Sequence, residues 1–115
     1  MELLKELCET PGIPGHEEQL RAIVRRELKD CSDEMRVDAL GNLICVKRGR
    51  SAKKLMIAAH MDEIGFVVTY IEDKGFLRLA PLGGHDPRNM VAQHVLVRGK
   101  DGQYLRGLLY PGQKP

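Results

Sequence analysis

A histidine and an aspartate lie two residues apart where a long apolar run ends. Residues 55–59 are apolar without interruption, and His60, Asp62 and Glu63 follow before apolar residues resume. Successive side chains of a strand point to opposite faces, so His60 and Asp62 can point to the same side. A metal-binding imidazole usually donates its other ring N–H to a carboxylate. This spacing indicates either one metal ligand with its orienting carboxylate or an ordinary hydrogen-bonded strand end.

Other polar residues offer weaker candidates. Glu63 either extends the same network or marks the turn that follows it. The remaining histidines do not stand at ligand spacing to His60. We expect His16 to open a helix, His85 to lie in a Gly-rich loop and His94 to lie in a strand. The carboxylates that we expect in turns or on the surface are Asp33, Asp38 and Asp73.

The composition is typical of a folded domain. The chain has 115 residues, of which 43% are hydrophobic and 30% charged, and its net charge of +2 calls for neither a nucleic acid nor a membrane partner. No apolar run approaches the ~20 residues that span a bilayer. An amphipathic helix pattern follows Met1 in place of a signal peptide. We therefore expect a cytoplasmic, reducing setting, with Cys8 and Cys45 as small core residues.

The elements that position these residues change in kind along the chain. Helical spacing of apolar residues predicts helices within residues 2–10 and 16–30, separated by the breaker "TPGIPG". Two strands with a turn at Leu40-Gly41-Asn42 follow. The unbroken apolar run 55–59 predicts a central strand that is covered on both faces and carries His60 at its carboxyl end. This order is typical of an α/β layered domain.

The pattern after residue 64 predicts short strands alone. The connectors contain Lys74-Gly75, Gly83-Gly84 and Asp101-Gly102, the last being a strong hairpin signal. The segment "DPRNM" predicts one helical turn that is capped by Asp86. We accordingly predict two domains, an α/β part over residues 1–64 and a small β domain over residues 65–115.

Four blocks, in order, give the sequence a family resemblance. These are "PGIPGHEEQLR", "RVDALGNLICVKRG", "IAAHMDEIGF" and "APLGGHDPRNM" followed by "VLVRGKDG". The sequence resembles the cytoplasmic metallo-aminopeptidases that include glutamyl, deblocking and tetrahedral aminopeptidases, whose members are often labelled cellulase or endoglucanase M. The resemblance implies the start of a zinc-exopeptidase-like α/β/α layered domain, followed by part of an inserted β-barrel dimerisation domain.

The resemblance also implies a chemistry for two residues. His60 corresponds to the family's first metal-ligand histidine and Asp62 to the aspartate that orients it. The family enzyme holds two divalent metal ions, zinc or cobalt, which activate a water that attacks the first peptide bond of a peptide substrate. The family's other ligands and its general base do not map onto this chain. We therefore expect the N-terminal portion of such an enzyme, inactive alone, that forms homo-oligomers through its β domain.

Two other functions compete with this one. A non-catalytic interaction module is the alternative, since an incomplete barrel exposes strand edges that pair with another chain. Endoglucanase activity is disfavoured because glycosidases need two carboxylates flanking a sugar. Asp62 is better explained beside His60, and no second carboxylate is singled out.

Overall fold

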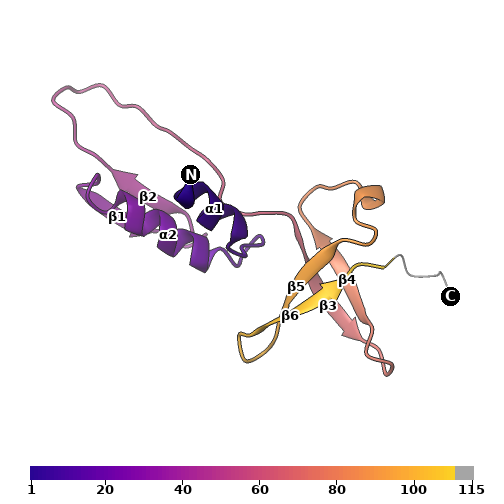
Figure 1. Ribbon diagram of the computed structural model, residues 1–115. Helices are drawn as coiled ribbons and strands as arrows, with labels where there is room; N and C mark the ends of the chain where they lie inside the picture. Colours follow the sequence, from indigo (N-terminus) through magenta and orange to yellow (C-terminus); the bar gives the residue numbers. More distant parts are fainter. Residues whose placement is uncertain (111–115) are drawn as a thin grey trace. The chain divides into compact units, whose positions relative to one another are not determined.

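The computed structural model describes residues 1–110, in which short helices and two-stranded antiparallel sheets alternate (Figure 1). The chain divides into two compact units, Met1–Gly83 and Gly84–Pro115. The mixed α/β class agrees with the sequence analysis. The predicted domains, 1–64 and 65–115, divide the chain elsewhere and stay a prediction, and residues 111–115 of the second lie outside the described residues.

Two helices open the first unit, as the apolar spacing predicts. They are α1 (Glu2–Glu9) and α2 (Glu18–Leu28). The first turn of α2 contains an acidic residue and its last turn contains two arginines, an order that complements the helix dipole. Leu20 and Ile23 of α2 are 4% and 9% exposed, and they are the buried apolar side chains of the described chain. The core of this unit therefore lies on one face of α2.

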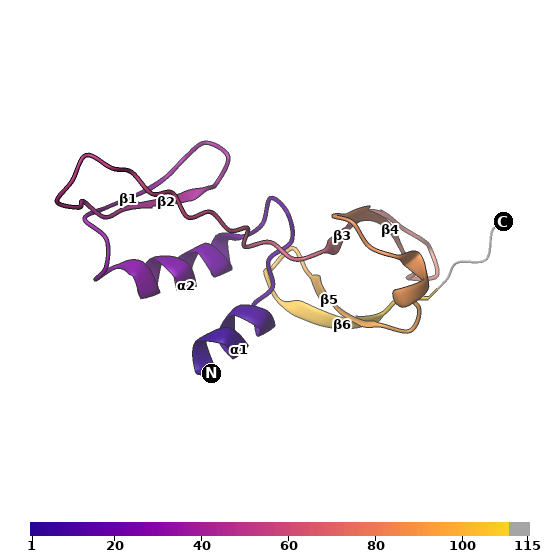
Figure 2. The same ribbon diagram turned by 90° about the horizontal axis from the view of Figure 1, so that it is seen from above.

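The predicted hairpin follows α2 and lies against it (Figure 2). Strands β1 (Glu34–Val37) and β2 (Leu43–Val46) pair antiparallel, with Met35 opposite Cys45. Gly41 takes a φ of 86° in the turn, a backbone conformation that residues other than glycine rarely adopt. The Arg21 guanidinium of α2 donates to the Gly41 carbonyl at 2.6 Å, which ties the helix to the turn.

The prediction of a central strand over residues 55–59 is wrong. The segment has no regular secondary structure, and Leu55, Met56 and Ile57 are 87%, 86% and 88% exposed (Figure 1). The cause is the absence of a pairing partner: each described strand pairs within a two-stranded sheet, and none is hydrogen-bonded to this run. A strand leaves its N–H and C=O groups unpaired without partners, so apolar sequence alone does not hold it in a sheet.

A second hairpin closes the first unit. Strands β3 (Gly65–Ile71) and β4 (Leu77–Leu82) pair antiparallel, with a register shift between Val68 and Tyr70. Thr69 lies at this irregularity, and its hydroxyl donates to the Arg78 carbonyl at 3.1 Å. The predicted strands are confirmed here with slightly different ends.

The second unit contains the short helix and the last hairpin that the sequence predicts. The helix η1 (Pro87–Asn89) has Asp86 as its N-cap, whose carboxylate accepts from the Arg88 N–H at 3.0 Å. Strands β5 (His94–Arg98) and β6 (Tyr104–Leu108) pair antiparallel. Gly102 takes a φ of 81° in their turn, as the Asp-Gly pair predicts.

Two further observations concern expectations about the chain's setting. Cys8 is exposed and Cys45 half-buried, so the core position predicted for Cys8 is wrong. Helix α1 buries none of its residues, and the apolar face that carries Cys8 is therefore left uncovered. None of the helices in residues 1–110 has the length and apolar character needed to cross a membrane.

Candidate functional site

The structure brings the two predicted site residues into contact. The Nδ1 atom of His60 lies 3.2 Å from Oδ1 of Asp62 and 3.0 Å from the Asp62 backbone oxygen. The His60 side chain is 84% exposed, whereas that of Asp62 is 36% exposed. The contact forms although the preceding run is not a strand, because the two residues are near neighbours in the sequence.

The contacts of His60 favour a hydrogen on its Nδ1 atom. A backbone carbonyl is an acceptor only, so a hydrogen bond across the 3.0 Å contact is formed by the tautomer with its N–H at Nδ1. In the neutral imidazole the other nitrogen, Nε2, then holds a lone pair. This is the tautomer in which a metal-ligating histidine donates one N–H to an oxygen and binds the ion with the other nitrogen.

Glu63, whose role the sequence left open, contacts the N-terminal turn. Its backbone N–H donates to the Gly12 carbonyl at 2.8 Å, and its Oε1 accepts from the Gly12 N–H at 3.4 Å. Gly12 lies in the "TPGIPG" segment between α1 and α2. Sequence reasoning did not single out Gly12; the available signal was a dense Pro-Gly turn, which marks a close approach of backbone segments.

The carboxylates predicted as turn or surface groups behave as expected. The Asp33 carboxylate accepts from the Lys47 ammonium at 2.8 Å and from the Arg48 N–H at 2.6 Å, which lowers the pKa of Asp33. Asp38 accepts from the side chain and N–H of Asn42 and from a further turn N–H, which lowers its pKa too. Asp73 lies exposed in the β3–β4 turn.

Within residues 1–110, no three or more His, Cys, Asp and Glu side chains gather in an arrangement that could hold a metal ion. His16 is exposed and forms no hydrogen bond with His60. Its backbone N–H donates to the Ile13 carbonyl at 2.9 Å. His94 is exposed at the start of β5. The described donor set around His60 is therefore one imidazole and the carboxylate beside it.

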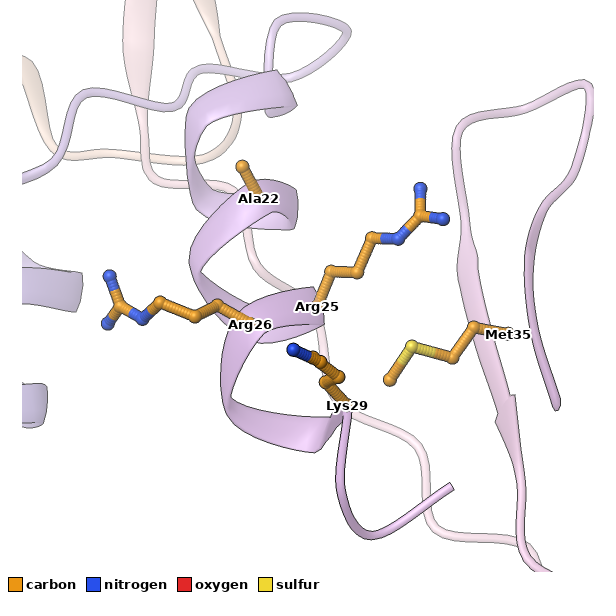
Figure 3. Close-up of a pocket in the computed structure, with 5 residues that line it drawn as sticks. All are labelled: Ala22, Arg25, Arg26, Lys29 and Met35. Atoms are coloured by element: carbon orange, nitrogen blue, oxygen red, sulfur yellow. The ribbon is translucent and has the colours of Figure 1, made fainter. Parts of the chain in front are cut away.

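A basic hollow lies between α2 and β1 (Figure 3). Its cavity volume is about 520 Å³, and Ala22, Arg25, Arg26, Lys29 and Met35 line it. In Figure 3, Arg25 and Met35 face the gap between helix and strand, whereas Arg26 points to the other side. There Arg26 contacts Glu6 at 2.6 Å, which lowers the pKa of Glu6. The lining has no carboxylate, histidine or cysteine, and no general base stands beside Lys29 in it, so it offers no catalytic pair.

Comparison with known proteins assigns the chain to a family. Residues 41–114 match the M42 glutamyl aminopeptidase family. The lysyl aminopeptidase of Pyrococcus furiosus is 45% identical over 103 residues, which are 89% of this chain and 30% of that protein. The chain thus spans about a third or less of the length of the curated relatives that it matches.

Solved structures of the same kind share the fold of the described chain. An aminopeptidase from the archaeon Desulfurococcus kamchatkensis matches with a TM-score of 0.89 and 39% identity, over 98% of this chain and 33% of that one. The TET1 peptidase of Pyrococcus horikoshii, which can assemble into a tetrahedron or a large octahedral shell, matches with a TM-score of 0.83 and 39% identity, over 99% and 34%. The chain belongs to the M42 glutamyl aminopeptidase family.

Proposed function

We propose that this chain supplies the first metal ligand, His60, of a metal-dependent aminopeptidase, and that Asp62 orients it. The observation that carries the proposal is the pair of contacts from Nδ1 of His60 to Asp62, which leaves Nε2 available for an ion. The M42 family membership supports the reaction, the removal of N-terminal residues from peptides.

The described residues offer one ligand for a metal site. A catalytic zinc takes about three protein ligands and keeps one position open. His60 offers one such ligand, and the carboxylate of Asp62 is engaged at its other ring nitrogen. We propose that the remaining ligands and the general base lie outside this chain, so that the 115 residues alone do not hydrolyse peptides.

Each of the two residues has a separate task in this proposal. Two bound zinc or cobalt ions would supply Lewis-acid polarisation and a water of lowered pKa. His60 binds through Nε2. Asp62 holds the ring orientation and keeps the N–H on Nδ1, which leaves the lone pair of Nε2 for the ion. Neither residue takes a proton from the substrate.

The proposed architecture and assembly follow the family. We propose that residues 1–64 belong to a zinc-exopeptidase-like layered domain and residues 65–115 to an inserted β-barrel. The TET1 neighbour assembles into closed shells, and this chain exposes large apolar side chains on the strands after residue 64, among them Tyr70, Leu96 and Leu105. A homo-oligomer formed through the β strands would cover them.

Those same exposed strands favour a second candidate, a non-catalytic interaction module. In that case the purified chain would pair through its strand edges but would not require metal at His60. The effect of His60→Ala on metal content, measured in a protein that supplies the remaining ligands, separates the two candidates, because His60 is needed in one and dispensable in the other.

A chimaera tests the proposed function. The segment of the Desulfurococcus kamchatkensis aminopeptidase that matches this chain is replaced by the 115 residues, and hydrolysis of leucyl-, lysyl- and glutamyl-anilides is measured with zinc or cobalt. We expect metal-dependent turnover. His60→Ala should remove it and lower bound metal, whereas Asp62→Asn should cost roughly 10–100-fold in activity or metal affinity.

The matched control is His94→Ala, which removes an exposed histidine at the start of β5. It should leave turnover and metal content close to those of the parent chimaera. A His60→Ala chimaera that keeps full activity and its full metal content would refute the ligand role. Metal-dependent turnover by the isolated 115-residue chain would refute the proposal that ligands are missing from it.

A further inference from the structure

Glu63 and Gly12 form a reciprocal contact across 51 residues of sequence. The Glu63 N–H donates to the Gly12 carbonyl at 2.8 Å, and the Gly12 N–H donates back to Oε1 of Glu63 at 3.4 Å. Two bonds between one pair of residues fix orientation as well as distance. The pair, called the Gly12–Glu63 bracket below, joins the segment after Asp62 to the turn between α1 and α2.

The Gly12 end of the bracket and the chain just after Glu63, at Gly65, lie against other side chains. The position that a Cβ at Gly12 would take is occupied by the side chain of Leu20, which is buried in the core of this unit. The position that a Cβ at Gly65 would take is occupied by the side chain of Ile13. Glycine at these two places therefore allows the chain segments to approach closely, and the bracket is held between α2 and the start of β3.

The chain before the bracket has no comparable anchor. In the described residues, positions 54–62 form no backbone hydrogen bond to another segment, and Leu55, Met56 and Ile57 are almost fully exposed. Glu63 is the next residue along the chain after Asp62. The position of His60 and Asp62 relative to α2 is therefore set from the Glu63 side.

We infer that Glu63 is a positioning residue for the His60–Asp62 pair, acting through the Gly12–Glu63 bracket. Its side chain contacts the Gly12 backbone and takes no part in the proposed ligand set. Without the Glu63 carboxylate, the backbone bond alone joins residue 63 to Gly12, so the orientation of the segment 60–62 is less restricted and the two side chains sample more orientations. The inference rests on the proposed function only for what His60 then binds.

The first test measures order in the isolated chain, without metal. Nuclear magnetic resonance gives the amide exchange rate of Gly12 and the order of the His60 ring. Glu63→Ala removes the acceptor of the Gly12 N–H and keeps the backbone bond from residue 63. It should speed exchange at Gly12 about five- to tenfold, since a typical hydrogen bond contributes on this scale, and should lower the order of the His60 ring. Glu63→Gln keeps an oxygen at the same reach and should behave much like the parent.

Two further variants separate reach from charge and from general damage. Glu63→Asp keeps the negative charge but is one methylene shorter, so it should resemble Glu63→Ala. The control Glu17→Ala removes a carboxylate of the same type that accepts from another glycine N–H, that of Gly15, at 2.6 Å and only two residues away. It should leave the His60 ring unchanged. Circular dichroism checks that each variant retains its helices.

The second test uses the chimaera described above. Glu63→Ala should lower kcat about tenfold with little change in KM, Glu63→Gln should restore it, and Glu17→Ala should leave it unchanged, because misplacing a reacting group acts on the chemical step. An inactive parent chimaera would count against the proposed function, while the first test still decides on the bracket. Unchanged order of the His60 ring in a folded Glu63→Ala chain, or order kept by Glu63→Asp and lost in Glu63→Gln, would overturn the inference.

Discussion

Helix α2 and the segment 55–59 are both rich in apolar residues, yet the structure treats them in opposite ways. Leu20 and Ile23 of α2 are buried, while Leu55 and Ile57 are exposed. A helix satisfies its own backbone hydrogen bonds and needs cover on one face only, which the β1–β2 hairpin provides locally. An extended run needs a neighbouring strand for its backbone and cover for two faces, and the described residues offer neither.

An apolar run specifies less about the fold than a helix or hairpin pattern does. Apolar character predicts that a segment will be buried once partners exist, and it does not create the partners. Elements whose partners lie a few residues away, such as the three hairpins, form as the sequence predicts.

The largest expected effect is the contrast between Leu20→Ala and Leu55→Ala, the same substitution in the two regions. Leu20→Ala should lower the free energy of unfolding by about 2–5 kcal/mol, because it empties a buried position. Leu55→Ala should change it by less than about 0.5 kcal/mol, as expected for an exposed side chain. Urea denaturation followed by circular dichroism measures both. Equal losses would show that residues 55–59 are buried in the chain in solution.

A smaller effect is expected where α2 holds the first hairpin. Arg21→Met removes the 2.6 Å hydrogen bond from the guanidinium to the Gly41 carbonyl while keeping most of the side chain's apolar bulk. The loss in unfolding free energy should be about 1–2 kcal/mol. The control is Arg25→Met, which changes an arginine of the basic hollow that has no such bond. If the two variants were equally stable, the tie between helix and turn would contribute nothing.

The smallest effect concerns the turn of that hairpin and its pH dependence. Hydrogen bonds from Asn42 and Leu40 lower the pKa of Asp38 below its usual value. The stabilisation is therefore complete above the unfolded carboxyl pKa of about 3.9 and is lost as the pH falls through the lower value of the folded chain. Asp38→Ala should flatten the acid side of the stability profile. An acid side that stays as steep in Asp38→Ala as in the parent would contradict the assignment.

The candidate site was found in part from the sequence. His60 and Asp62 are two residues apart, so their contact at 3.2 Å requires little beyond local backbone geometry. The Gly12–Glu63 bracket joins residues 51 positions apart, and no local pattern pairs them. The expectation of a core Cys8 failed for the same reason as the strand at residues 55–59: the apolar face of α1 exists, but nothing in the described chain covers it.

Local sequence patterns are enough to specify the two helices, the hairpin turns, the capped turn at Asp86 and the spacing of His60 and Asp62. Each of these depends on backbone preferences and contacts between residues close in sequence. Only the tertiary structure decided which apolar segments are buried and that Glu63 bonds to Gly12. Burial and long-range hydrogen bonds depend on what lies beside a segment in space, and the sequence of the segment does not contain that information.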